Sequence, residues 1–131
     1  MTAGIAPHLL GIQELVYFVP DVAEARTWYE AVLGEPPVFD HPDYCAFALG
    51  GQQIGLHPAD AKTAAGVSGQ VGYWRVDDFD AVLSRLLAQG ARLYRGPIVG
   101  VDGARVCQVL DPFGNAIGLV TPADSVPDAV G

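Results

Sequence analysis

The feature that most constrains this chain is a strand, cap and helix pattern that occurs twice. Near the N-terminus, residues 12–19 are rich in β-branched and aromatic types and end at Pro20-Asp21, which predicts a strand followed by a turn. Asp21 and Glu24 form a start that resembles a capping box. Apolar residues then recur at helical spacing until Gly34, which predicts an amphipathic helix that ends there.

The second copy of the pattern follows in the other half of the chain. Residues 71–76 predict a strand, Asp77 and Asp78 predict the cap, and an apolar helical stripe runs on to Gly90. Asp78 lies 57 residues after Asp21, so the two copies are in matching positions of two similar halves. A repeat of this kind predicts two copies of one supersecondary unit.

Shorter strand-like segments complete each half. They cover residues 38–39, 44–49 and 53–57 in the first half and 91–94, 105–110 and 116–120 in the second. Neither half can cover both faces of its own sheet, so the halves must pack together. We therefore predict an α+β fold of two tandem βαβββ modules, forming a curved mixed sheet around a central pocket with the helices outside. The single domain spans 1–131, with modules at about 10–57 and 70–121, a linker at 58–69 and a tail at 122–131.

Composition limits the partners and the compartment. Half of the residues are hydrophobic, while seven Lys and Arg face fifteen Asp and Glu, for a net charge of −8. Nucleic-acid binding needs clustered cations and is not expected. The chain has no apolar run of membrane-spanning length and no signal-peptide pattern, so we expect a cytoplasmic protein without a membrane partner. Cys45 and Cys107, each inside an apolar run, are expected to be buried free thiols.

From about residue 10 to 121 the chain resembles the vicinal oxygen chelate superfamily, the group of glyoxalases, bleomycin-resistance proteins and extradiol dioxygenases. The resemblance is carried by the unit from Leu15 to Gly34, by residues 76–91 and by residues 111–117. The last segment contains Asp-Pro-Phe-Gly-Asn between two predicted strands. Each residue there suits a turn, because Asp initiates it, Pro restricts φ, and Gly and Asn tolerate positive φ.

The resemblance also locates a possible metal centre. Metal-dependent members of the family place four ligands, usually His, Glu or Gln, on four strands. The matching positions are Glu14, Gly55, Val71 and Gly118 here. Only Glu14 has a donor atom in its side chain, whereas a catalytic zinc or iron normally needs three protein ligands. We therefore expect no family metal centre and no cofactor, which puts glyoxalase, dioxygenase and metal-dependent resistance-transferase activities in doubt.

A shifted metal site is the alternative. His57 lies two residues beyond Gly55 and on the same face of its predicted strand. A site made of Glu14, His57 and either His41 or His8 is conceivable. The simpler interpretation places His57, which precedes a proline, at the rim of the pocket or on the surface.

Strand alternation predicts which side chains line the pocket. If Glu14 points inward, Leu15, Tyr17 and Val19 pack under the first helix. The predicted ligand-binding residues are Glu14, Val16, Phe18, Gln53, Gly55, His57, Val71, Tyr73, Arg75 and Gly118, with Ala116 and Val120 completing the lining. The glycines and the valine are expected to leave space. Glu14 is either functional, as a general base or as the partner of a cationic group, or it pairs with Arg75.

Three functions fit this pattern. The first is a metal-free binding protein of the bleomycin-resistance type that sequesters a small aromatic or cationic compound. The second is a lyase, isomerase or dioxygenase acting on a small oxygenated substrate, with Glu14 and His57 as candidate acid and base. The third is a subunit whose main role is assembly. A small-molecule ligand and a homodimer are the expected partners, and the identity of the ligand stays open.

Overall fold

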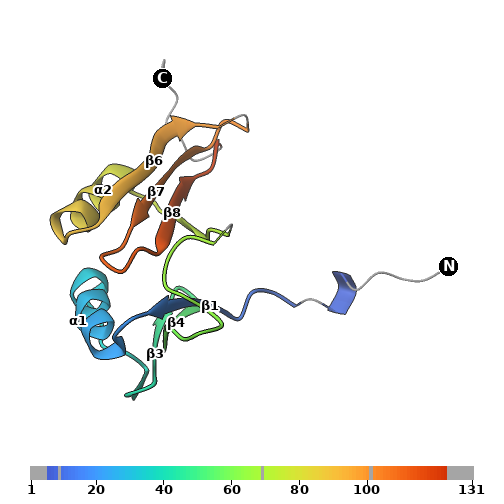
Figure 1. Ribbon diagram of the computed structural model, residues 1–131. Helices are drawn as coiled ribbons and strands as arrows, with labels where there is room; N and C mark the ends of the chain where they lie inside the picture. Colours follow the sequence, from blue (N-terminus) through green and yellow to red (C-terminus); the bar gives the residue numbers. More distant parts are fainter. Residues whose placement is uncertain (1–5, 9, 69, 101, 124–131) are drawn as a thin grey trace.

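The computed structural model describes residues 6–8, 10–68, 70–100 and 102–123, and it contains two βαβββ modules, one above the other in Figure 1. A short 3-10 helix over Ala6–His8 precedes them. The first module consists of β1 (Glu14–Val19), α1 (Val22–Leu33), β2 (Phe39–His41), β3 (Tyr44–Leu49) and β4 (Gln52–Pro58). The second consists of β5 (Tyr73–Arg75), α2 (Phe79–Ala88), β6 (Arg92–Val99), β7 (Arg105–Leu110) and β8 (Ala116–Thr121). The predicted fold class is confirmed.

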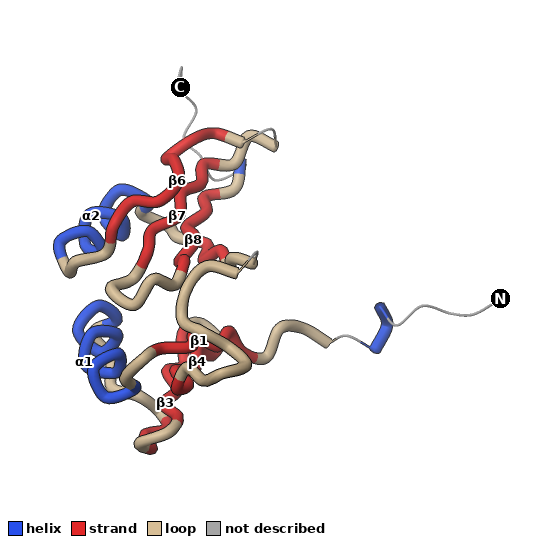
Figure 2. Tube along the Cα trace, viewed as in Figure 1, coloured by secondary structure: helices blue, strands red, loops and turns tan. Residues whose placement is uncertain are grey.

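Each module forms a four-stranded mixed sheet of its own. The strand orders are β1-β4-β3-β2 and β5-β8-β7-β6, so β1 and β5 are edge strands in matching places. Both pair in parallel with the last strand of their module, and the other neighbours are antiparallel. The two helices lie on the same side of the molecule (Figure 2). We call the sheet face turned away from its helix the inner face.

Both helices begin and end where the sequence predicts. The Asp21 carboxylate accepts a hydrogen bond from the Glu24 amide at 3.1 Å, and Gly34 closes α1 in the left-handed region with φ of 75°. In α2 the cap is Asp78, which accepts from the Ala81 amide at 3.1 Å. Each capping side chain satisfies an amide that the first turn of a helix leaves without a partner.

Side-chain alternation along the strands confirms the predicted orientation of β1. Tyr17 and Val19 are buried beneath α1, whereas Val16, which precedes Tyr17, is 39% exposed on the inner face. In β5, Trp74 packs against the core while Tyr73 stays 46% exposed. The buried side chains of both modules form one continuous hydrophobic core, which lies on the helix side of the sheets. The exposed Val16 and Tyr73 lie on the inner faces.

The turn between β7 and β8 joins the two modules. One oxygen of the Asp111 carboxylate accepts from the backbone amides of Phe113, at 2.9 Å, and Asn115, at 2.8 Å. The other oxygen accepts from the Tyr29 hydroxyl of α1 at 2.6 Å. The Asn115 amide group donates to the Phe18 carbonyl at 3.0 Å. A turn of the second module is therefore bonded to both α1 and β1 of the first.

A few boundaries differ from the prediction. β5 is shorter than the predicted 71–76 strand, and β6 is longer than 91–94. The extension of β6 passes through Gly96-Pro97 with a register shift against β7, which an edge strand can accommodate. Residue 69 of the predicted linker and residues 124–131 of the predicted tail lie outside the described residues. No helix in the described part of the chain is both long and apolar enough to cross a membrane.

The Tyr29 hydroxyl is expected to contribute measurably to stability. Tyr29→Phe removes the donor to a buried carboxylate but keeps the ring, so the free energy of unfolding should fall by about 1–3 kcal/mol. Urea denaturation of the purified variants measures this. Tyr94→Phe on the exposed strand β6 is the matched control and should change stability by less than about 0.5 kcal/mol. Equal effects of the two substitutions would contradict the role of the Tyr29–Asp111 bond.

Asp111 is also expected to give stability a specific pH dependence. Burial raises the pKa of its carboxyl group, although the hydrogen bonds from Tyr29, Asn115 and Phe113 partly offset the effect. A raised folded-state pKa favours folding while the carboxyl is protonated in both states, below about pH 3.9, and this contribution is lost as the pH rises through the folded-state pKa.

The unfolding free energy of the natural chain should therefore decrease relative to that of Asp111→Asn as the pH rises from about 3.5 to 7.5. Urea denaturation at intervals across this range measures the difference, in which the titration of other groups cancels. A constant difference would show that the hydrogen bonds balance burial, and one that increases with pH would show that they outweigh it; either result would contradict the raised pKa.

Candidate functional site

The pairing of β1 with β4 assembles the inner face of the first module. The two strands run parallel with Glu14 opposite Gln53 and Phe18 opposite His57, so these four side chains lie on one face in two rows. The Phe18 and His57 rings are 4.9 Å apart between centroids. These predicted site residues are thus brought together as pairs by the parallel register.

The Glu14 carboxylate is held from two sides. Its Oε2 atom accepts a hydrogen bond from the Tyr44 hydroxyl, and it accepts a second one from Gln53 Nε2 at 2.5 Å. The same Nε2 atom lies 3.2 Å from the Tyr44 hydroxyl oxygen. Burial and the bond to Glu14 raise the pKa of the Tyr44 phenol, so Tyr44 remains a donor at neutral pH. The three side chains form a fixed polar group, which we call the Glu14 triad.

Among the described residues, Glu14 and Arg75 do not form the ion pair that the sequence offered as an alternative. The ion pairs of the described residues all involve Arg26 or Arg105, so Arg75 takes part in none of them. Sequence reasoning missed Tyr44, which it placed only in a strand. The antiparallel pairing of β3 with β4 puts Cys45 opposite Leu56 and hence Tyr44 beside His57 on the inner face. A correct prediction of the β3–β4 pairing would have placed Tyr44 on the inner face.

Two tyrosines fill the space at the two glycines. A Cβ atom at Gly55 would lie 2.8 Å from the ring and hydroxyl of Tyr44, and one at Gly118 would lie 2.5 Å from the ring of Tyr73. The Tyr73 hydroxyl accepts from Gln108 Nε2 at 2.7 Å. The expectation that Gly55 and Gly118 leave open space is therefore wrong: each glycine lets a tyrosine lie flat against the sheet.

The residues at the four family positions do not fit a metal centre. Gly55 and Gly118 are covered by tyrosine rings, half-buried Val71 has no donor atom, and Glu14 already accepts two hydrogen bonds. The shifted site is not assembled either. His57 Nδ1 is 2.8 Å from the Pro58 carbonyl oxygen, and His41 accepts from the Asp43 amide. Within the described ranges, no three His, Cys, Asp or Glu side chains are grouped as metal ligands would be.

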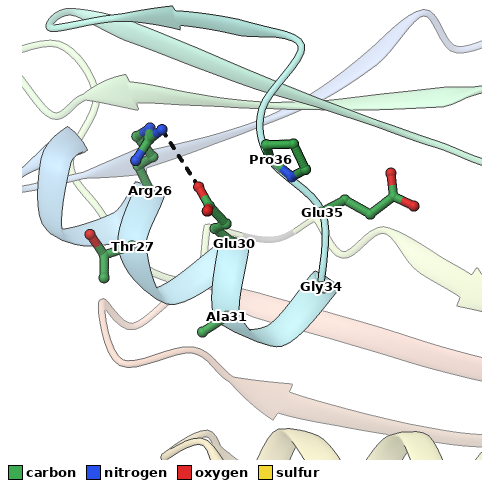
Figure 3. Close-up of a pocket in the computed structure, with 7 residues that line it drawn as sticks. All are labelled: Arg26, Thr27, Glu30, Ala31, Gly34, Glu35 and Pro36. Carbon is green, nitrogen blue, oxygen red and sulfur yellow. Dashed lines mark ion pairs between the residues drawn. The ribbon is translucent and has the colours of Figure 1, made fainter.

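Arg75 lies apart from the Glu14 triad. It lines three cavities, of about 550, 440 and 530 Å³. The first lies beside the edge strands, the second lies on the helix side, and the third is also lined by Asp77 and Thr121. A further hollow of about 400 Å³ lies on the outside of α1, where Figure 3 shows Arg26 directed at Glu30. That arginine pairs with Glu30 at 3.5 Å and with Asp40 at 2.9 Å, so its charge is compensated. No predicted site residue lines the hollow.

Paired βαβββ modules with a half-buried acid on one inner face define a class of small α+β proteins, and comparison with known proteins identifies the family. The sequence profile of the Glyoxalase/Bleomycin resistance protein/Dioxygenase superfamily matches residues 11–119. The chain belongs to this superfamily, which confirms the resemblance seen in its sequence. No curated protein matches the chain.

Solved structures of the superfamily share the fold. A superfamily member from Sphaerobacter thermophilus DSM 20745 has a TM-score of 0.73 at 22% identity, covering 87% of this chain and 98% of that one. A glyoxalase / bleomycin resistance protein from Catenulispora acidiphila DSM 44928 has a TM-score of 0.65 at 24% identity, covering 89% and 100%. A lactoylglutathione lyase from Agrobacterium tumefaciens has a TM-score of 0.68 at 21% identity, covering 86% and 93%. At these identities the likeness concerns the fold.

Steric coupling between Gly55 and Tyr44 can be tested directly. Gly55→Ala should destabilise the chain by about 1–3 kcal/mol, because the new methyl group must displace the Tyr44 phenol from Glu14. In a Tyr44→Ala background the same substitution should cost clearly less, since the ring that it meets is gone. Urea denaturation of the two single variants and the double variant gives the coupling energy. Strictly additive costs would mean that the phenol does not rest on Gly55.

Proposed function

We propose that this chain is a small-molecule-binding protein that works without the family metal centre and takes an aromatic or cationic compound on its inner faces. The observation that carries the proposal is the Glu14 triad. Tyr44 and Gln53 both donate to Glu14 Oε2, which fixes the position of the carboxylate. A carboxylate has only acceptor atoms, so a ligand group that binds it must be a donor. A half-buried carboxylate held in this way favours a cationic partner, because its two neutral donors leave its negative charge uncompensated.

The surroundings of the triad support an aromatic ligand. Val16 is 39% exposed, and Phe18 lies on the same side of β1 as Val16 and Glu14. Flat apolar and aromatic surfaces around one oriented polar group are the usual composition of a small-molecule site. We expect a ring to lie against these side chains while its charged substituent reaches Glu14.

The catalytic alternative has less support in the geometry. The His57 ring packs on Phe18 and directs Nδ1 at the Pro58 carbonyl, so its described contacts are with neighbours other than Glu14. The homodimer stays a prediction, to which the exposed apolar residues of β6 lend weight, with Ile98 60% and Val99 67% exposed. A cytoplasmic location is likewise part of the proposal, in keeping with the free cysteines Cys45 and Cys107.

A matched set of naphthalene probes tests the proposal. 1-Naphthylmethylammonium, 1-naphthalenemethanol and 1-naphthoate share one ring system and differ in charge. The cation should raise the melting temperature of the full chain most. Glu14→Gln should weaken its binding about tenfold or more, as expected for the loss of a charge-assisted hydrogen bond. Glu35→Gln, an exposed residue after α1 with the same charge change, is the control and should leave binding unchanged.

The metal content of the protein tests the second part of the proposal, namely that the chain works without the family metal centre. Protein purified without chelator should contain no stoichiometric zinc, nickel, manganese or iron by elemental analysis, and none of these ions should raise its melting temperature through Glu14. A tightly held metal that is lost in Glu14→Gln would overturn the metal-free function. Equal binding of the cation by the natural chain and by Glu14→Gln would assign Glu14 a structural role instead.

A further inference from the structure

A groove between the two modules combines apolar walls with an arginine that forms no ion pair among the described residues. It is lined by residues of both edge strands, β1 and β5, and the Leu15 side chain packs against Gly72, at which a Cβ atom would lie 2.5 Å from Leu15 Cδ1. The cavity of about 550 Å³ is lined by Ile12, Leu15, Leu49, Trp74 and Arg75 among others. A neighbouring cavity of about 440 Å³ shares Leu49, Trp74 and Arg75. We call this space the seam groove.

Arg75 differs from the arginines that the fold uses. Arg26 and Arg105 form ion pairs with acidic side chains, and Arg85 donates to the Ala31 carbonyl at 3.2 Å. Arg75 is exposed and takes part in none of the ion pairs or side-chain hydrogen bonds of the described residues. Arg92 and Arg95, on the exposed strand β6, also stand outside the described ion pairs, but neither lines these cavities. In the part of the chain that the structure describes, Arg75 is thus an exposed cation beside an apolar surface and outside every ion pair.

We infer that the seam groove binds an apolar compound that carries one carboxylate, with Arg75 holding the carboxylate and Trp74, Leu15 and Leu49 contacting the apolar body. A guanidinium matches a carboxylate with two parallel hydrogen bonds. The volume lies within the range of small-molecule pockets. The Trp74 indole, half-buried at the junction of both cavities, offers a flat face for an aromatic ring.

This site is distinct from the Glu14 triad. Leu15 and Glu14 are consecutive in β1, so their side chains are on opposite faces of the strand, with Leu15 against the core and Glu14 on the inner face. The charges at the two places are also opposite. An anion should therefore choose the seam groove and a cation the inner face, and each site can fail without the other.

NMR titration of the full ¹⁵N-labelled chain with the three naphthalene probes tests the inference. 1-Naphthoate should bind several-fold more tightly than 1-naphthalenemethanol and shift the amide resonances of Leu49, Gly72 and Trp74. Arg75→Gln should weaken naphthoate binding about tenfold and remove the preference over the alcohol. Arg92→Gln, with the same charge change on β6, should leave it unchanged.

A second variant tests the groove without altering Arg75. Ile12 is 71% exposed at the mouth of the groove, so Ile12→Asp should preserve the fold and weaken naphthoate binding through charge repulsion. Three results would overturn the inference: equal binding of naphthoate and the alcohol, equal losses in Arg75→Gln and Arg92→Gln, or naphthoate shifts centred on Glu14 and Gln53. Glu14→Gln should not change the affinity for naphthoate, so a failure of this inference can be told apart from a failure of the proposed inner-face site.

Discussion

The two modules are held in register by one buried carboxylate. Asp111 organises its own turn through two backbone amides and at the same time accepts from the Tyr29 hydroxyl of the other module. Asn115 in the same turn donates to the Phe18 carbonyl of β1 and accepts from the Gly66 amide of the connecting segment. A buried carboxylate is costly unless its oxygens are bonded, so the turn, α1 and β1 are stable only in this mutual arrangement. Both candidate sites depend on it, because β1 carries Glu14 on one face and Leu15 on the other.

The two candidate sites differ in the charged group that each contains. On the inner face, the Glu14 carboxylate accepts hydrogen bonds from two donors, and tyrosine rings pack against the two inner-face glycines. At the seam, an arginine is kept without an acidic partner among the described residues, between walls that are mostly apolar. The seam groove thus presents a cation on a chain whose net charge is −8. The same fold therefore offers two chemically opposite surfaces.

Local signals in the sequence predicted much of this fold. The caps Asp21 and Asp78 and the strands at 44–49 and 105–110 depend on residues close in the chain, and the structure has them as predicted. The common face of Glu14, Phe18, Gln53 and His57 was predicted from alternation along two strands, whereas their pairing comes from the register of β1 with β4. The contribution of Tyr44 was not predicted, and Arg75 was predicted to line the inner pocket but not to lie at the seam. Tyr44 reaches Glu14 across 30 residues of sequence, and Arg75 lies at a junction of two modules, so both depend on pairings that no local pattern specifies.

The tyrosines over Gly55 and Gly118 have a consequence for substitutions at these two positions. A side chain added at either position would first have to displace a packed ring, and at position 118 it would also meet the Gly72 carbonyl 2.8 Å away. Each step toward four metal ligands would thus lower stability before any ion could be held, since one or two ligands bind too weakly to compensate. Single substitutions toward a coordination sphere are therefore opposed by the packing of the two tyrosines.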